Sequence, residues 1–114
     1  MYMMYMEQII KSYFDAFCAK NLSKLSELYS DDIVLSEWGE NVFVGKQAVL
    51  EANNNLFSKF TNISIEILSC GEDDLLPVSL NEILVKLDDE QVKVVDVITI
   101  IDNKITKINA YRGF

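Results

Sequence analysis

The chain has 114 residues and a formal net charge of −8, with half of its residues hydrophobic and a quarter charged. These values are typical of one compact domain over residues 1–114, large enough to bury a continuous core. The acidic excess argues against binding to nucleic acid or to an anionic membrane surface, because both need a basic patch. No apolar run reaches the length that a membrane-spanning helix needs.

The first residues, Met1-Tyr2-Met3-Met4-Tyr5-Met6, include neither a basic region nor a small-residue cleavage site. This segment is therefore not expected to be a secretory signal peptide. We expect it to form the first turn of a helix, with Met3, Met4 and Met6 as alternative translation starts.

The cysteine and histidine content limits the kinds of catalytic and metal site that the chain can form. In a chain without a secretion signal, Cys18 and Cys70 indicate two reduced, buried thiols and a cytoplasmic protein. Histidine is absent, which removes the commonest general base and most zinc sites. We expect neither a metal nor another cofactor, since the acidic groups Asp31-Asp32 and Glu72-Asp73-Asp74 have no fixed partner spacing and are expected to be solvated turns.

Three helices are predicted within the first 60 residues. Helical spacing of apolar residues predicts a first helix that ends near Lys20, and Asn21 is a suitable N-cap for a short second helix. Asp31-Asp32 ends that second helix. Gly45 opens a third helix, on which Asn53 to Asn55 are expected to be solvated. The apolar stripes of the three helices are Met6, Ile9, Ile10, Tyr13, Phe14 and Phe17; Leu22, Leu25, Leu28 and Tyr29; and Ala48, Val49, Ala52, Leu56 and Phe60.

The rest of the chain is predicted to form strands, because its apolar residues recur with a period of two. A phase slip at Glu82-Ile83 indicates a bulge in one of them. Helices followed by a run of antiparallel strands define an α+β domain, in which helices cover one face of a curved sheet. The expected strands cover residues 33–38, 42–44, 63–68, 78–87, 91–101 and 105–114.

Asp96 is the most informative residue, because it lies within a strand of β-branched residues that reads as buried on both faces. Alternation along the strand places it on one face with Val92, Val94, Ile98 and Ile100. A carboxylate in that row must be hydrogen-bonded, paired with a cation or protonated, since an isolated buried charge is too costly.

The pairing of Asp96 depends on the hairpin that follows it. A three-residue loop over Asp102 to Lys104 puts Asp96 opposite Ala110, on one face with Ile108 and Arg112. Arg112 is then a diagonal neighbour that can hold Asp96 as an ion pair. A two-residue loop instead puts Lys107, Asn109 and Tyr111 on that face, and both alternatives stay open at this point.

Several segments of the chain together resemble the nuclear transport factor 2-like superfamily, which includes ketosteroid isomerases and SnoaL-like polyketide cyclases. The resemblance implies three N-terminal helices on a strongly curved, mostly antiparallel sheet, forming a conical barrel with a cystatin-like fold. It also implies one apolar pocket and a homodimer packed through the sheet. The segments are Tyr13-Phe14-Asp15-Ala16-Phe17, Lys20-Asn21-Leu22, Tyr29-Ser30-Asp31-Asp32-Ile33-Val34, Val44-Gly45-Lys46 and the hairpin from Asp96 to Ile105.

The same resemblance implies roles for three residues. Glu37 falls where the isomerases carry their proton-shuttling aspartate, Tyr13 falls on their phenol donor, and Asp96 falls on their protonated carboxylic acid. Glu37 would then move a proton next to a carbonyl, while Tyr13 and neutral Asp96 hydrogen-bond the developing enolate oxygen.

Each of these residues also has a simpler interpretation. Tyr13 lies in a helical aromatic stripe, which is usually core packing. Glu37 lies near a strand end, where a solvated glutamate is as expected as a pocket base. Trp38 follows Glu37 and is therefore expected on the opposite face of the strand, where it lines either the pocket mouth or a dimer interface. Asp96 is either an ion pair with Arg112 or a protonated donor.

The sequence thus predicts a domain that binds a small hydrophobic organic molecule and carries out isomerase- or cyclase-type proton transfer. The alternative is a non-catalytic homodimer, a ligand carrier or interaction domain, whose sheet residues Val95, Val97 and Ile101 make the interface. The residues expected to contact the ligand are Phe14, Phe17, Trp38, Phe60, Ile98, Ile108 and Arg112.

Overall fold

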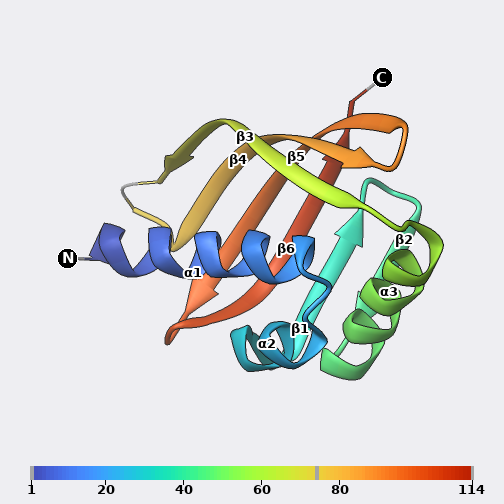
Figure 1. Ribbon diagram of the computed structural model, residues 1–114. Coiled ribbons are helices and arrows are strands. Elements are labelled where there is room, and N and C mark those ends of the chain that lie inside the picture. Colours follow the sequence, from blue (N-terminus) through green and yellow to red (C-terminus); the bar gives the residue numbers. More distant parts are fainter. Residues whose placement is uncertain (1, 74, 114) are drawn as a thin grey trace.

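The computed structural model describes residues 2–73 and 75–113, with side chains from Tyr5 onward. Helices and strands follow the predicted order, with three helices interleaved with the first two strands and then four strands in succession (Figure 1). The elements are α1 (Tyr2–Cys18), α2 (Leu22–Leu28), β1 (Tyr29–Glu37), β2 (Asn41–Val44), α3 (Lys46–Lys59), β3 (Ile63–Glu72), β4 (Val78–Leu87), β5 (Glu90–Ile101) and β6 (Lys104–Arg112).

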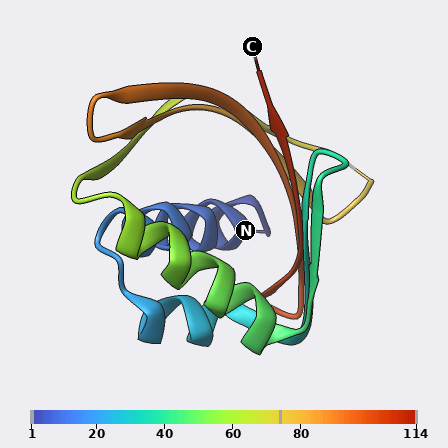
Figure 2. The same ribbon diagram turned by 90° about the vertical axis from the view of Figure 1, so that its right-hand side faces the viewer.

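All six strands form one sheet in the order β2-β1-β6-β5-β4-β3. Neighbouring strands run antiparallel except β1 and β6, which are parallel. The sheet curves around the helices, which cover its concave face (Figure 2). The predicted α+β class is confirmed, and the barrel is an open one, with β2 and β3 as its two edges.

The core lies between the helices and the concave face. On α3 its inner face consists of Val49, Asn53 and Phe57, all buried and spaced at i, i+4. The expectation that Asn53 is solvated is therefore wrong, while Asn54 and Asn55 are exposed as predicted. The largest fully buried side chains of the molecule are Tyr29, Leu25, Ile33, Ile83, Ile98, Ile105, Ile108, Val49 and Asn81.

The second helix is shorter than predicted. The Asn21 side chain accepts a hydrogen bond from the Lys24 backbone nitrogen at 3.0 Å, as its N-cap role requires. The helix ends at Leu28, so Tyr29 begins β1 and Asp31-Asp32 lie within that strand. The consequence is that Tyr29 projects into the core from a strand and is fully buried.

Three further expectations change in the late strands. The register irregularity predicted at Glu82-Ile83 lies in the partner strand, between Ile67 and Ser69 of β3, while β4 pairs continuously with β5. Both cysteines are free, but neither is fully buried as predicted: Cys18 is half-buried, and Cys70 is exposed because it lies on the edge strand β3 beyond that irregularity. β6 ends at Arg112, and Phe114 of the predicted strand lies outside the described residues.

Candidate active site

The β5–β6 hairpin sets the position of Asp96 in an unforeseen way. Its turn has two residues, Asp102 and Asn103, with φ angles of 52° and 64° that suit a tight hairpin. A register shift between Thr99 and Ile100 then adds one residue on the β6 side. As a result Asp96 lies opposite Ala110, the register expected for a three-residue loop.

One row of residues crosses the concave face at this level. Glu37 on β1 pairs with Ala110 on β6, Ala110 pairs with Asp96 on β5, and Asp96 pairs with Asn81 on β4. The two carboxylate residues are therefore separated by two strand spacings, about 10 Å between backbones. The side chain between them is a single methyl group, which leaves space above Ala110.

The Asp96 carboxyl group is buried, with only 6 % of the residue exposed. Burial disfavours the charged form and raises the pKa of Asp96 to about 7 from an ordinary value of 3.8. Within residues 2–73 and 75–113 this group makes no hydrogen bond and no ion pair. At neutral pH the neutral and ionised forms are thus present in comparable amounts.

Arg112 does not neutralise Asp96. The two residues are on the same face of the sheet and diagonal to each other, as expected, but Arg112 is exposed and forms no ion pair with any described residue. The structure therefore contradicts the ion-pair alternative. The reason is that the Arg112 side chain lies at the end of β6, where its guanidinium group can remain in water.

Asn81 lies directly opposite Asp96 and is 1 % exposed. Its amide nitrogen donates to the Ser79 hydroxyl at 3.0 Å. Its amide oxygen is buried and has no hydrogen-bond donor among the described residues. A buried carbonyl oxygen in this condition is unusual and costs free energy.

A second polar chain runs through the core from α1 to α3. The Tyr29 hydroxyl donates to the Asn53 amide oxygen at 2.6 Å, and Tyr13 hydrogen-bonds to Tyr29. Burial raises the pKa of Tyr13 well above its ordinary value, and the nearby Tyr29, Asp96 and Glu37 raise it further. Tyr13 is therefore a neutral phenol close to both carboxylate residues. Its ring also packs against those of Phe14, Phe17 and Tyr29, so it serves both as core and as a polar group.

An interior hollow of about 1330 Å³ lies between the helices and the concave face. Asn53 and Ala110 are among its lining residues, whereas Tyr29 and Asn81 lie behind its wall. The predicted residues Tyr13, Glu37 and Asp96 all line it, with Glu37 exposed at the rim. Of the predicted ligand contacts, five line the hollow and two do not. Phe14, Phe17, Trp38, Ile108 and Arg112 line it, whereas Ile98 is fully buried in the core and the Phe60 backbone carbonyl binds the Lys20 amino group.

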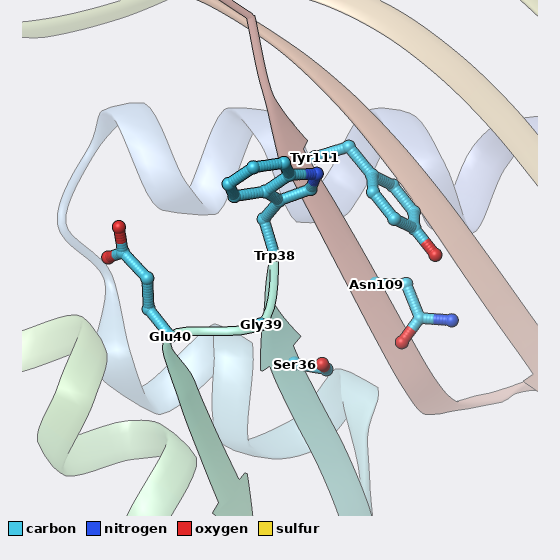
Figure 3. A pocket seen from close by; sticks show the side chains of 6 residues that line it. All are labelled: Ser36, Trp38, Gly39, Glu40, Asn109 and Tyr111. Atoms are coloured by element: carbon cyan, nitrogen blue, oxygen red, sulfur yellow. The ribbon is translucent and has the colours of Figure 1, made fainter.

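A second hollow of about 460 Å³ lies on the other face of the sheet, lined by Ser36, Trp38, Gly39, Glu40, Asn109 and Tyr111 (Figure 3). Trp38 is half-exposed and borders both hollows, which agrees with the predicted position at the mouth of a pocket. Its predicted position in a dimer interface stays a prediction. The Glu40 carboxylate points away from the two β6 side chains. We place the candidate site in the interior hollow, because the buried titratable groups are there.

Two residues near the site, Asn53 and Asn81, were not expected there from the sequence, while Tyr29 was expected only as apolar packing and Ala110 only as the neighbour of Asp96. Asn81 carried one usable signal, since asparagine is depleted from strand interiors. For the others the signal is tertiary, because each acquires its role only from a neighbour on a distant element.

Among residues 2–73 and 75–113 no group of acidic or cysteine side chains is arranged to hold a metal ion. No helix in this part of the chain has the length and apolar character to cross a bilayer.

Comparison with known proteins identifies the family and the fold of this chain. The family model of the SnoaL-like domain matches residues 10–108. The chain therefore belongs to the SnoaL-like family, which confirms the resemblance drawn from its motifs. No curated protein sequence matches the chain.

Solved structures show the same fold at low sequence identity. A protein of unknown function with a cystatin-like fold from Methylobium petroleophilum has a TM-score of 0.85 and 14% identity, covering 96% of this chain and 76% of its own. An epoxide hydrolase from M. tuberculosis has a TM-score of 0.80 and 16% identity over 96% and 84%. A protein with a ketosteroid isomerase-like fold from Catenulispora acidiphila, in complex with trimethylamine, has a TM-score of 0.78 and 13% identity over 90% and 83%.

Proposed function

We propose that this protein binds a small hydrophobic organic molecule in the interior hollow and catalyses a proton transfer on it. The observation that carries the proposal is Asp96, a buried carboxylic acid with a pKa of about 7 on the wall of that hollow. An acid with such a pKa can both give and take a proton at neutral pH. Ligand sites are mostly apolar and hold a few convergent polar groups, and the lining of this hollow fits that description.

Each polar group has a part in the proposed reaction. Glu37 exchanges a proton with a carbon atom of the ligand from the rim, and Asp96 shares a proton with the oxygen of the same ligand. Tyr13 hydrogen-bonds that oxygen from α1. The methyl group of Ala110 leaves the ligand room to lie between the two carboxyl groups. This division of roles corresponds to a keto–enol isomerisation, or to the enolisation step of a cyclisation.

The test follows solvent deuterium exchange next to the carbonyl of a small bound cyclic ketone, measured by NMR. We expect Asp96→Asn and Glu37→Gln each to slow exchange by about 100-fold or more, the usual contribution of a positioned acid or base. Glu40→Gln is the matched control, since Glu40 lines the same rim without belonging to the row of Glu37 and Asp96. Undiminished exchange in both test variants would exclude the mechanism.

A second candidate function is a non-catalytic homodimer that carries a ligand or binds another protein. A row of outward side chains supports it, since Leu80 on β4 pairs with Val97 on β5 and both alternate with the inward residues. Leu80 is 46% exposed and Val42 62% exposed, and an apolar sheet face of this kind is stabilised by a partner. The second copy would pack its own sheet against this face.

Light scattering after size-exclusion chromatography tests the dimer. We expect a dimer that Leu80→Lys converts to a monomer, because a charge in the sheet interface is left unpaired. Leu75→Lys is the control, since Leu75 is exposed in the β3–β4 loop. A monomer at every concentration excludes this arrangement.

We further propose a cytoplasmic location, in which the free thiols Cys18 and Cys70 stay reduced.

A further inference from the structure

The direction of each hydrogen bond around the hollow decides whether the protein offers a ligand donor groups or acceptor groups there. A hydroxyl group has one proton to donate, so a hydroxyl that already donates to the protein offers a ligand only its oxygen lone pairs. Three buried polar side chains line the hollow, Tyr13, Asn53 and Asp96. Tyr13 and Asp96 each carry one hydroxyl proton, and the acceptor of that proton can be identified.

The Tyr13 proton is engaged inside the protein. Because the Tyr29 hydroxyl gives its single proton to the Asn53 amide oxygen, Tyr29 can only accept in its hydrogen bond with Tyr13. Tyr13 must therefore be the donor in that bond. Its oxygen, which borders the hollow, is then an acceptor toward any ligand.

Asp96 leads to the same result in both protonation states. Ionised, the carboxylate is an acceptor only. Neutral, it has one proton, and the amide oxygen of Asn81 directly opposite is a buried acceptor that lacks a donor. Residues paired across antiparallel strands have Cβ atoms about 5 Å apart, which is within reach of these two short side chains. In the empty site a neutral Asp96 can give its proton to Asn81, and its other carboxyl oxygen is then the acceptor that faces the hollow.

We propose that the polar end of the ligand, in the form that the site binds best, is a hydroxyl group, which donates its hydrogen bond to Tyr13 or Asp96, so that the site holds a small apolar alcohol, or the enol of the proposed keto–enol pair, more tightly than the ketone. This inference rests on the proposed function of the interior hollow as a binding site for a small apolar molecule. A ketone oxygen would face two acceptor oxygens and leave them unpaired, which is unfavourable in a buried site. An alcohol can also accept a hydrogen bond, so it is compatible with the Asn53 amide in the same wall.

The test compares three ligands of one shape, indane, 2-indanone and 2-indanol, by NMR titration of the full-length protein at pH 7. We expect 2-indanol to bind about fivefold more tightly than 2-indanone, the ratio that corresponds to one net hydrogen bond of roughly 1 kcal/mol. Equal binding, or tighter binding of the ketone, would overturn the inference and leave the proposed binding function intact. If none of the three binds, the proposed function fails, and the inference fails with it.

Two tyrosine variants make the test specific to proton direction. In Tyr29→Phe the acceptor of the Tyr13 proton is gone, so Tyr13 can donate into the hollow, and we expect the preference to shift toward 2-indanone. Tyr13→Phe should reduce the preference for the alcohol. Tyr111→Phe removes a hydroxyl from the outer hollow and should leave the ratio unchanged. A merely structural role of Tyr29 would lower the affinity for both ligands without changing their ratio, and that outcome would also overturn the inference.

Discussion

Asp96 and Asn81 face each other directly across β5 and β4, and each has a hydrogen-bonding need that the other can meet. The acid has no partner among the described residues, and the amide oxygen has no donor. The Ser79 hydroxyl accepts from the Asn81 amide nitrogen and so fixes which end of the amide is available. A hydrogen bond from the neutral Asp96 carboxyl group to the Asn81 amide oxygen therefore gives both groups a partner.

The first prediction is that this hydrogen bond exists in the neutral form of Asp96 and can be seen by infrared spectroscopy. The chain contains no histidine, so a difference spectrum between about pH 5.5 and 8.5 reports mainly this carboxyl group. We expect Asn81→Leu to shift the C=O band of the neutral acid to higher frequency, since the acceptor of its proton is lost.

Ser79→Ala is the matched control for this measurement. It removes a neighbouring polar group but keeps the Asn81 amide oxygen, so the acid band should stay in place. An unshifted band in Asn81→Leu would show that the acid proton points elsewhere. In the wild-type protein, the side-chain amide signals of Asn81 should titrate together with Asp96 in an NMR experiment, whereas those of exposed Asn54 should not.

The second prediction concerns stability against pH. The folded-state pKa of Asp96, about 7, lies above its ordinary value of 3.8, so the folded protein holds this proton more tightly than the unfolded chain. Between these two values the unfolded state binds fewer protons, and the contribution of Asp96 to the free energy of unfolding falls as pH rises. Above pH 7 the full cost of the buried charge is present, as much as about 4 kcal/mol.

Asp96→Asn removes that charge while keeping the shape of the side chain. We therefore expect the variant to gain stability relative to wild type as pH rises from 4 to 7, and the gain to level off above pH 7. Urea unfolding at pH 4.5 and pH 8.5 measures the difference. Asp89→Asn, in the exposed β4–β5 turn, removes a charge without any burial and provides the control. A gain that is the same at both pH values would contradict the assigned burial cost.

The sequence predicted the architecture because alternation and helical spacing are local signals. The geometry of a strand placed Val94, Asp96, Ile98 and Ile100 on one face, and the burial of the last three confirms this row. The opposite face was expected to be buried as well, but its residues are half-buried or exposed, namely Val95, Val97, Thr99 and Ile101. The end of α2 was misplaced because Tyr29 fits a helix as well as a strand, and only its burial against Tyr13 and Asn53 decides between them.

The candidate site was predicted only in part, because its geometry depends on pairings that no local pattern encodes. Ala110 lies between Glu37 and Asp96 only because β1 and β6 run parallel and because one extra residue shifts the β5–β6 register. Asn53 was expected to be exposed to solvent because it is polar, but the Tyr29 hydroxyl on another element gives it a buried hydrogen-bond partner. Buried polar residues of this kind can be recognised only after the fold has brought donor and acceptor together.

The third prediction tests that buried pair. Asn53→Ala removes the acceptor of the Tyr29 hydroxyl inside the core, so we expect a loss of about 1–3 kcal/mol in the free energy of unfolding. The adjacent Asn54 is exposed on the same helix, and Asn54→Ala should change stability by no more than about 0.5 kcal/mol. Equal effects of the two substitutions, measured by urea unfolding, would show that the Tyr29–Asn53 bond contributes nothing.

The last prediction separates the neutral-acid description of Asp96 from an ion pair with Arg112. An ion pair would lower the pKa of Asp96, so removing the guanidinium would raise it. Because Arg112 is exposed and forms no ion pair with a described residue, we expect Arg112→Gln to shift the Asp96 pKa by less than about half a unit. The infrared titration used for Asn81 measures this value directly. Lys93→Gln, which removes a cation from the same rim, is the control. A rise of a full unit or more, confined to Arg112→Gln, would mean that the guanidinium reaches the carboxylate in solution, and Asp96 would then lack the proton that its proposed role requires.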